Sequence, residues 1–333
     1  MNKKFWTGKN VLITGFEGFL GSNLTRALIP SGARIIGLDI KTGRKATLLA
    51  PDDYRRISVV KGSVANYKLL EKIIRENKIN LVFHLAAEAI VGKCHNRPLS
   101  AFSANIRGTW NVLEACRNAK NIEAVILASS DKAYGIHEKL PYTEKAPLQG
   151  SHPYDVSKSC ADLIANTYAH TYGLPVCVTR CGNIYGPGDF NSSRLVPDAV
   201  KCALAGKKLL IRSDGLFTRD YVFVEDIVNG YILLAEKMRK LNLAGEAFNF
   251  SCENPLTVIE LVKMIAKSVG KPVDYKILNQ AKYEIKHQYL SSRKARAKLG
   301  WKPKFSVLAG LIQTIESYRV KRGAKGDGSI FPV

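Results

Sequence analysis

The sequence predicts an α/β fold in which a doubly wound parallel sheet is joined to a smaller C-terminal α/β lobe. Short apolar runs alternate with helical patterns along the first 180 residues, which is typical of parallel strands connected by crossover helices. A glycine-rich turn follows the first apolar run, and an aspartate ends the second. The chain has 333 residues, of which 46% are hydrophobic, and this is enough to bury a large core. These observations predict a Rossmann domain over residues 1–180 and a smaller, interleaved lobe over residues 181–320.

Each expected element follows from its hydrophobic period, because buried parallel strands are short apolar runs whereas amphipathic helices repeat every three to four residues. The strands are expected at 10–14, 34–38, 57–60, 81–87, 124–128 and 176–180, and the helices at 22–29, 66–76, 98–117 and 154–172. Beyond residue 180 we expect short strands at 209–212, 219–224 and 247–250, and helices at 194–204, 225–236, 257–269 and 307–318. The basic, glycine-rich segment 321–333 is expected to be a flexible tail.

A glycine motif joins the first strand to the first helix and consists of Gly15, Phe16, Glu17, Gly18, Phe19, Leu20 and Gly21. Glycines permit a tight turn and let backbone N–H groups approach a pyrophosphate at the helix N-terminus. Asp39 ends the second strand, eighteen residues beyond the motif, where a carboxylate holds the ribose hydroxyls of a dinucleotide and repels a 2′-phosphate. NAD is therefore favoured over NADP, and Lys41, Arg44 and Lys45 weaken this preference. The alternative is a glycine turn without a ligand.

The fourth strand ends in small residues. Ala86 and Ala87 follow Leu85 at the end of the run 81–87 and leave room for a flat cofactor close to the backbone. His84 lies within the same apolar run, and we interpret it as a hydrogen-bonded core residue.

Two polar groups lie near the fifth strand. Ser130, Asp131 and Lys132 follow the apolar run 124–128, and Tyr154 and Lys158 begin a helical pattern. A spacing of four places the tyrosine and the second lysine on one helix face. Because an ammonium stabilises a neighbouring phenolate, the tyrosine is a candidate base near neutral pH.

Composition narrows the class of protein. The formal charge is +22, which is compatible with attraction of an anionic substrate, binding to nucleic acid or membrane surfaces, or solubility alone. The cations are spread along the chain without a nucleic-acid motif, so neither nucleic acid nor membrane is expected as a partner. The seven cysteines have no CxxC spacing, which indicates free thiols and no metal site. No apolar run reaches the roughly 18–20 residues of a membrane span, and the N-terminus fits no signal peptide, so a cytoplasmic location is expected.

A further set of motifs occurs in a fixed order along the chain: GxxGxxG, Asp39, His84-Leu85-Ala86-Ala87, Asn105 with Gly108-Thr109, Tyr154-x-x-x-Lys158, Arg180-x-x-Asn183-x-Tyr185-Gly186-Pro187-Gly188 and Arg219-Asp220-Tyr221-Val222. With these motifs the chain resembles, over residues 9–318, the extended short-chain dehydrogenase/reductases that act on nucleotide sugars. Ser130-Asp131-Lys132 is similar to the signature of sugar-nucleotide 4,6-dehydratases, and the segments 183–197, 247–250 and 287–303 are most similar to CDP-glucose 4,6-dehydratases.

The resemblance implies an NAD-dependent lyase of carbohydrate biosynthesis, with an NAD-binding first domain, a nucleotide-sugar-binding second lobe and a homodimer formed through two helices of the first domain. It implies that Tyr154 takes the proton from sugar O4 while Lys158 lowers its pKa and binds the nicotinamide ribose. Ser130 is expected to hydrogen-bond O4, and Asp131 to protonate the leaving C6 hydroxyl. Lys132 or a neighbour would remove the C5 proton.

The resemblance also implies two binding sets. The cofactor set is Gly15, Glu17, Gly18, Phe19, Leu20, Gly21, Asp39, Ile40, Lys41, Ser63, Val64, Leu85, Ala86, Ala87, Asn105, Ser129, Tyr154, Lys158 and Cys181. The substrate set is Glu88, Asn183, Arg194, Leu195, Pro197, Arg212, Arg219 and Arg293.

Three positions depart from the family pattern. Ser63 follows Gly62 where an aspartate usually accepts from the adenine amine, Lys132 occupies the position of a glutamate in dTDP-glucose enzymes, and the segment at Arg219 lacks Arg-Pro-Trp. The nucleotide base is therefore left open.

Several alternatives are left open as well. Instead of a catalytic pair, Asp131 and Lys132 could form an exposed ion pair. Instead of substrate ligands, Arg212 and Arg293 could be surface cations. A 4-epimerase on the same scaffold and a non-catalytic, NAD-bound binding protein with a basic surface are the two other functions considered.

Overall fold

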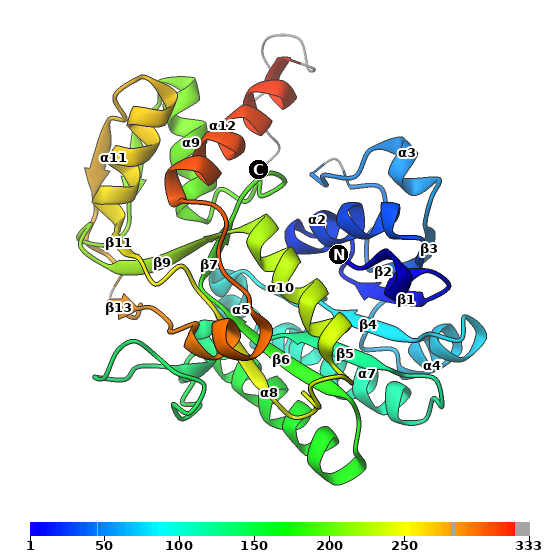
Figure 1. Ribbon diagram of the computed structural model, residues 1–333. Coiled ribbons are helices and arrows are strands. Elements are labelled where there is room, and N and C mark those ends of the chain that lie inside the picture. Colours follow the sequence, from blue (N-terminus) through cyan, green and yellow to red (C-terminus); the bar gives the residue numbers. More distant parts are fainter. Residues whose placement is uncertain (45, 282–283, 324–333) are drawn as a thin grey trace.

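A seven-stranded parallel sheet forms the centre of the molecule in the computed structural model, which describes residues 1–44, 46–281 and 284–323 (Figure 1). The strand order is β10-β6-β5-β4-β1-β2-β3. The strands are β1 Asn10–Thr14, β2 Arg34–Asp39, β3 Ser58–Lys61, β4 Leu81–His84, β5 Ala124–Ala128, β6 Val176–Cys181 and β10 Ala247–Phe250. The order reverses between β1 and β4, and ligands of such sheets bind beyond the carboxyl ends of the strands at this point.

Helices cover both faces of this sheet, and successive residues of a strand face opposite layers. In β1, Leu12 packs in one buried cluster with α4, α7 and α8, whereas Val11 and Ile13 pack in the other with α2 and α10. The helices are α2 Phe19–Leu28, α4 Tyr67–Glu76, α7 Gly108–Arg117, α8 Pro153–Tyr172 and α10 Val224–Lys237. Apolar residues on both faces of a strand explain why the strands are continuous hydrophobic runs.

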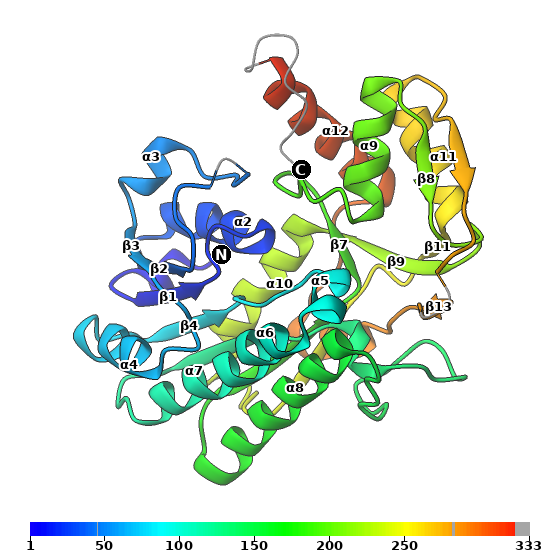
Figure 2. The ribbon, with the colours of Figure 1, turned by 180° about the vertical axis from the view of Figure 1, so that it is seen from behind.

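The second half of the chain builds a smaller lobe, in which α9, α11 and α12 lie together at one end of the molecule (Figure 2). Its sheet has the order β11-β9-β13, with β7 also paired to β9, and β12 pairs β8 separately. The elements are β7 Asn183–Tyr185, α9 Leu195–Ala205, β8 Leu209–Ile211, β9 Thr218–Phe223, β11 Pro255–Thr257, α11 Val258–Val269, β12 Tyr275–Ile277, β13 His287–Gln288 and α12 Val307–Gly323. Because β10 of this half pairs with β6, the two halves are interleaved.

Short helical elements complete the described chain. They are α1 Lys3–Trp6, η1 Ile29–Ser31, α3 Pro51–Tyr54, α5 Val91–Asn96, α6 Pro98–Phe102, η2 Ser103–Arg107, η3 Asp131–Tyr134 and η4 Ala295–Leu299. In the described part of the chain, no helix combines the length and apolar character that crossing a bilayer requires.

The predicted fold class is confirmed, with small differences in the elements. The strand expected at 81–87 ends at His84, because the next three residues turn away along the sheet edge. The long helix expected at 98–117 contains a π-helical turn over Ser103–Arg107. The predicted tail begins too early, because α12 continues to Gly323; residues 324–333 lie outside the described chain. The division into domains at residue 180 stays a prediction.

Candidate functional site

The glycine motif forms a narrow cradle between β1 and α2. Gly15 has a φ of +72°, a left-handed conformation that favours glycine, and a Cβ there would lie 2.9 Å from the Ala86 backbone. A Cβ on Gly18 would lie 3.1 Å from the Gly15 carbonyl oxygen, and one on Gly21 would overlap the same oxygen. Gly18 is the N-cap of α2 and supplies no side-chain cap. The residues present therefore fit the close approach of a pyrophosphate to the helix N-terminus.

Asp39 lies at the carboxyl end of β2 and is 5% exposed. Its carboxylate accepts hydrogen bonds from the guanidinium of Arg44 and, at 3.3 Å, from the backbone N–H of Lys41. Burial raises the pKa of Asp39, and Arg44 opposes this shift. Glu17 does not face outward, since its carboxylate accepts from the N–H groups of Gly43 and Arg44 at 2.7 and 2.8 Å. It thus holds the loop that follows β2, while Ile40 in that loop is exposed.

The remaining cofactor candidates lie around the sheet edge. Ser63 Oγ accepts from the N–H of Ala65 at 3.1 Å, so this hydroxyl is used within its own turn, and Val64 accepts through its carbonyl from Asn111 Nδ2 at 3.0 Å. Asn105 braces the loop after β4. Its Oδ1 accepts from the N–H of Glu88 at 2.8 Å, and its Nδ2 donates to Ser157 Oγ at 2.9 Å.

Backbone groups of Leu85 and Ala86 donate to Thr14 Oγ1 at 3.2 and 3.1 Å, so the loop after β4 is held against β1. Ala87 follows in this loop. Ser129 comes directly after β5, and Cys181 ends β6 and is buried. Both therefore lie at the same edge of the sheet as the glycine cradle.

Tyr154 and Lys158 lie on the first turns of α8. Lys158 is 6% exposed, its Nζ donates to the Ala128 carbonyl at 2.8 Å, and it lies 6.0 Å from the centre of the Tyr154 ring. Burial lowers the pKa of Lys158 to about 8. Burial raises the pKa of Tyr154, and the Ser130 hydroxyl opposes this shift. The pKa of the phenol is thus not lowered in this arrangement, and its role as a base stays a prediction.

The turn after β5 carries the second polar group. Ser130 caps η3, because its Oγ accepts from the N–H of Lys132 at 3.2 Å and donates to Asp131 Oδ1 at 3.0 Å. Asp131 is 4% exposed, so the alternative of an exposed surface pair is wrong for this residue. Burial raises the pKa of Asp131, opposed by Lys132, Ser130 and Arg219. A carboxyl group with a raised pKa keeps its proton closer to neutral pH, which suits a general acid.

Two arginines of the substrate set lie close to this centre. Arg219 is 7% exposed and lowers the pKa of Asp131 by its charge. Arg194 pairs with Asp189 at 2.8 Å and lies 5.8 Å from the ring centre of Phe19 in the glycine motif. Its charge also opposes the burial that raises the pKa of Tyr154. The Arg219 guanidinium also donates to the carbonyl oxygens of Thr218 and Lys286 at 2.9 and 3.0 Å and lies 3.7 Å from Glu284, so part of it is used within the smaller lobe.

The other substrate candidates differ in placement. Asn183 on β7 pairs with Tyr221 of β9. Leu195 begins α9, where Pro197 is buried. Arg212 and Arg293 are exposed, and Arg293 lines a hollow of about 450 Å³ together with Pro141, Glu253, Tyr289, Leu290, Ser291 and Arg296. Their binding roles stay predictions.

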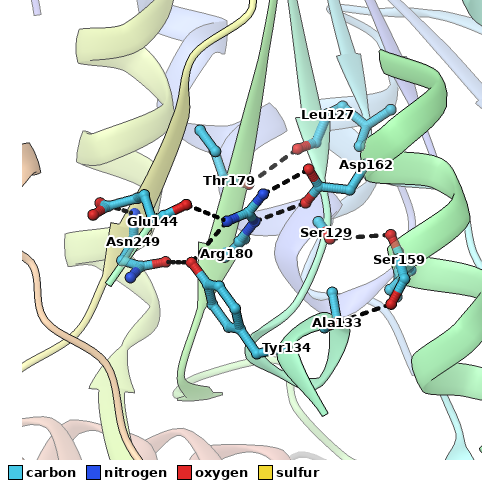
Figure 3. Close-up of polar contacts among 12 residues, drawn as sticks. Leu127, Ser129, Ala133, Tyr134, Glu144, Ser159, Asp162, Thr179, Arg180 and Asn249 are labelled. Carbon is cyan, nitrogen blue, oxygen red and sulfur yellow. Dashed lines mark hydrogen bonds and ion pairs between the residues drawn. The ribbon is translucent and has the colours of Figure 1, made fainter. Parts of the chain in front are cut away.

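A buried ionic network reaches Tyr134 of η3 and was missed by sequence reasoning (Figure 3). Arg180 on β6 makes a bidentate pair with Asp162 of α8, at 2.8 Å for each bond. The same guanidinium donates at 2.8 Å to the hydroxyl of Tyr134, which in turn donates to Asn249 of β10. The network connects α8, η3 and two sheet strands. Asp162 lies four residues beyond Lys158 on one helix face, a spacing that was available as a signal.

The histidine in β4 and the seven cysteines were considered as possible functional groups. His84 is 3% exposed, and its ring nitrogens contact Thr14 Oγ1 at 2.8 Å and Thr109 Oγ1 at 3.2 Å. The prediction of a hydrogen-bonded core histidine is confirmed. All seven cysteines are free thiols. Within the described ranges no group of three or more histidine, cysteine or acidic residues is arranged to hold a metal ion.

The chain is similar to known enzymes that act on nucleotide sugars. The model of the NAD dependent epimerase/dehydratase family matches residues 11–250. The chain is 29% identical to CDP-glucose 4,6-dehydratase of Salmonella typhimurium, covering 95% of this chain and 90% of that protein. It is also 29% identical to UDP-glucose 4-epimerase of Mycolicibacterium smegmatis, covering 93% and 98%.

A crystal structure of dTDP-glucose 4,6-dehydratase from Bacillus anthracis in complex with NAD has the same fold. The TM-score is 0.84 at 31% identity, with 95% of this chain and 98% of that chain covered. Because the family match runs from the first strand of the sheet to β10 and includes the glycine cradle and η3, this chain belongs to the NAD dependent epimerase/dehydratase family, and its cofactor is NAD.

Proposed function

We propose that the protein is a nucleotide-sugar 4,6-dehydratase, which converts an NDP-hexose to an NDP-4-keto-6-deoxyhexose with loss of water. The observation that carries the proposal is the position of Asp131. Its carboxyl group is buried, has a raised pKa, and lies between Ser130 and Lys132 at the end of β5. Oxidation and reduction at C4 alone, as in an epimerase, requires no such acid. Elimination of a hydroxyl group from C6 does.

The roles of the chain's own residues follow from this arrangement. Tyr154 takes the proton of the sugar O4 hydroxyl, and Ser130 orients that oxygen by a hydrogen bond. Lys158 adds positive charge beside the phenolate as it forms. NAD held in the glycine cradle would supply a hydride acceptor for C4 and a hydride donor for C6. Asp131 gives its proton to the departing C6 hydroxyl, which leaves as water, while Lys132 removes the proton from C5. When the hydride reaches C6, Lys132 returns its proton to C5, which completes the 4-keto-6-deoxy sugar. The carbon atoms C5 and C6 are adjacent, so an acid and a base on neighbouring residues suit this elimination.

The diphosphate of the substrate is proposed to bind to arginine side chains. The charge of Arg219 opposes the raised pKa of Asp131, and the charge of Arg194 opposes the raised pKa of Tyr154. Guanidinium groups bind phosphate oxygens well, so a nucleoside diphosphate is the substrate class. Relatives act on CDP-glucose and dTDP-glucose, which are both nucleoside diphosphate sugars.

A panel of UDP-, CDP-, dTDP- and GDP-hexoses, incubated with the protein and analysed by mass spectrometry, tests the function. We expect one nucleotide class to give a product lighter by one water molecule. A 4-epimerase, the function of the relative from Mycolicibacterium smegmatis, gives instead an isomer of equal mass. That result would replace the proposed reaction.

Replacing Asp131 with Asn is expected to separate oxidation from elimination. The amide keeps the shape of the side chain but has no proton to give, so the rate of water loss falls by about 10²- to 10⁴-fold. Oxidation at C4 continues, and the absorbance of reduced nicotinamide accumulates after mixing with substrate. Asp131→Glu, which keeps an acid, is expected to recover part of the elimination. Normal dehydration by Asp131→Asn would reject Asp131 as the acid.

A further inference from the structure

Gln288 is a buried residue from a distant part of the sequence. It directly contacts η3, the turn that carries the proposed acid and base. It ends β13, and its side chain is 0% exposed. Its Nε2 donates to the Asp131 carbonyl at 2.9 Å, and its Oε1 accepts from Lys132 Nζ at 3.3 Å. Both functional groups of the amide are thus used on two adjacent residues of η3.

The strand that carries Gln288 is itself held in register by the smaller lobe. In β13, Gln288 lies opposite Arg219 of β9, and the two strands are neighbours in Figure 1. Arg219 Nη1 donates to the Lys286 carbonyl at 3.0 Å, and Thr218 Oγ1 lies 3.0 Å from His287 Nδ1. Gln288 therefore connects the strand of a proposed phosphate-binding arginine to the turn that carries the acid and the base.

The chemistry of an amide matters at this position. A lysine side chain has several rotatable bonds, and fixing it in one direction costs conformational entropy. A lysine that removes the C5 proton must point steadily at C5. Its amine must also be unprotonated before it can accept that proton. A carboxylate would hold the ammonium but would stabilise its charged form, whereas a neutral amide oxygen fixes the direction with less of that stabilisation.

The charged and titratable groups around this corner include Asp131 on the turn, Asp155 on α8, and Arg219 and Asp220 on β9. His152 lies 3.4 Å from Asp155. Their charges act on the same space as the ammonium of Lys132. Gln288 is neutral and adds no charge to this set. It can therefore orient the lysine without changing the electrostatic environment of the ammonium group.

We infer that Gln288 is a positioning residue for the elimination step, which aims Lys132 Nζ and holds the backbone of Asp131 from β13. This role rests on the proposed dehydration. Gln288 acts only through its two neighbours and leaves the oxidation at C4 to Tyr154 and Lys158.

The test compares Gln288→Leu and Gln288→Glu with a control, Gln313→Leu, which makes the same substitution on α12, away from the turn and from β13. For Gln288→Leu we expect elimination about 10- to 100-fold slower, as for a small misplacement of a catalytic group. KM should stay within about twofold, and the absorbance of reduced nicotinamide should accumulate during turnover. The control should keep the wild-type ratio of oxidation to elimination.

Gln288→Glu places a carboxylate against Lys132 and stabilises its charged form. Because a lysine base must be neutral, the acidic limb of the pH profile of kcat should move to higher pH. A purely structural role would lower thermal stability in all variants without moving this limb or accumulating reduced nicotinamide. An unchanged ratio of oxidation to elimination in Gln288→Leu would overturn the inference while wild-type dehydration stands. A wild-type protein that yields only isomers of equal mass would overturn the proposed dehydration, and the role of Gln288 with it.

Discussion

Tyr154→Phe is expected to abolish turnover while cofactor binding is retained. The substitution removes one hydroxyl group and leaves the ring that lies 6.0 Å from Lys158 Nζ. Without an acceptor for the O4 proton, oxidation at C4 has no base, and the expected loss in kcat is about 10²- to 10⁴-fold. Steady-state product formation and isothermal titration with NAD measure the two properties separately.

Tyr172→Phe is the matched control for this substitution. Tyr172 lies on the same helix and is 54% exposed, so its hydroxyl is not required for chemistry at the sheet edge. If Tyr154→Phe turns over normally, the phenol is not the base. If the wild-type protein has no activity but binds nucleic acid with an affinity that falls steeply with salt, the non-catalytic alternative gains support.

Asp162→Ala is expected to cost about 3–5 kcal/mol of unfolding free energy, because it leaves the buried Arg180 guanidinium without its carboxylate. Both side chains are close to fully buried, at 6% and 5% exposure. The loss also affects the hydrogen bonds that the same guanidinium makes to Tyr134 and to the Glu144 carbonyl. Urea denaturation followed by circular dichroism, at fixed cofactor concentration, measures the change.

The comparison for this prediction is an ion pair in full contact with water. Asp52 pairs with Arg55 at 2.8 Å, and the two side chains are 84% and 79% exposed. Asp52→Ala should change the unfolding free energy little or not at all, because exposed pairs are weak. Asp162→Asn keeps the shape of the side chain, so it separates the loss of charge from the loss of volume. Equal effects of Asp162→Ala and Asp52→Ala would contradict the importance given to the buried network.

Much of the fold could be predicted because its signals are local. The run 10–14 alternates between two buried layers, and the motif from Gly15 to Gly21 can form only a tight turn before a helix. The spacing of Tyr154 and Lys158 placed both on one face of α8, which the structure bears out. The tail was expected from residue 321, whereas α12 continues to Gly323, because a basic, glycine-rich composition does not mark where a helix ends.

The candidate site was predictable in its residues and less so in their surroundings. Glu17 belongs to the glycine motif, yet its carboxylate holds the loop after β2 by two backbone hydrogen bonds. Asp39 was assigned to a ribose, and its carboxylate is also contacted by Arg44. Neither contact has a sequence signature, because each depends on how a loop folds back on the sheet.

By itself, the sequence determined the parallel sheet, the cradle at its first strand and the order of the polar residues along its edge. These features depend on the periodicity of hydrophobic residues and on the conformational freedom of glycines. Both are determined by residues that are close together in the chain. Only the tertiary structure decided that Asp131 is buried, that Arg180 is neutralised by Asp162, and that Gln288 reaches the turn from β13. Burial and hydrogen-bond partners set pKa values and orientations, and both are supplied by atoms that are far away in the chain.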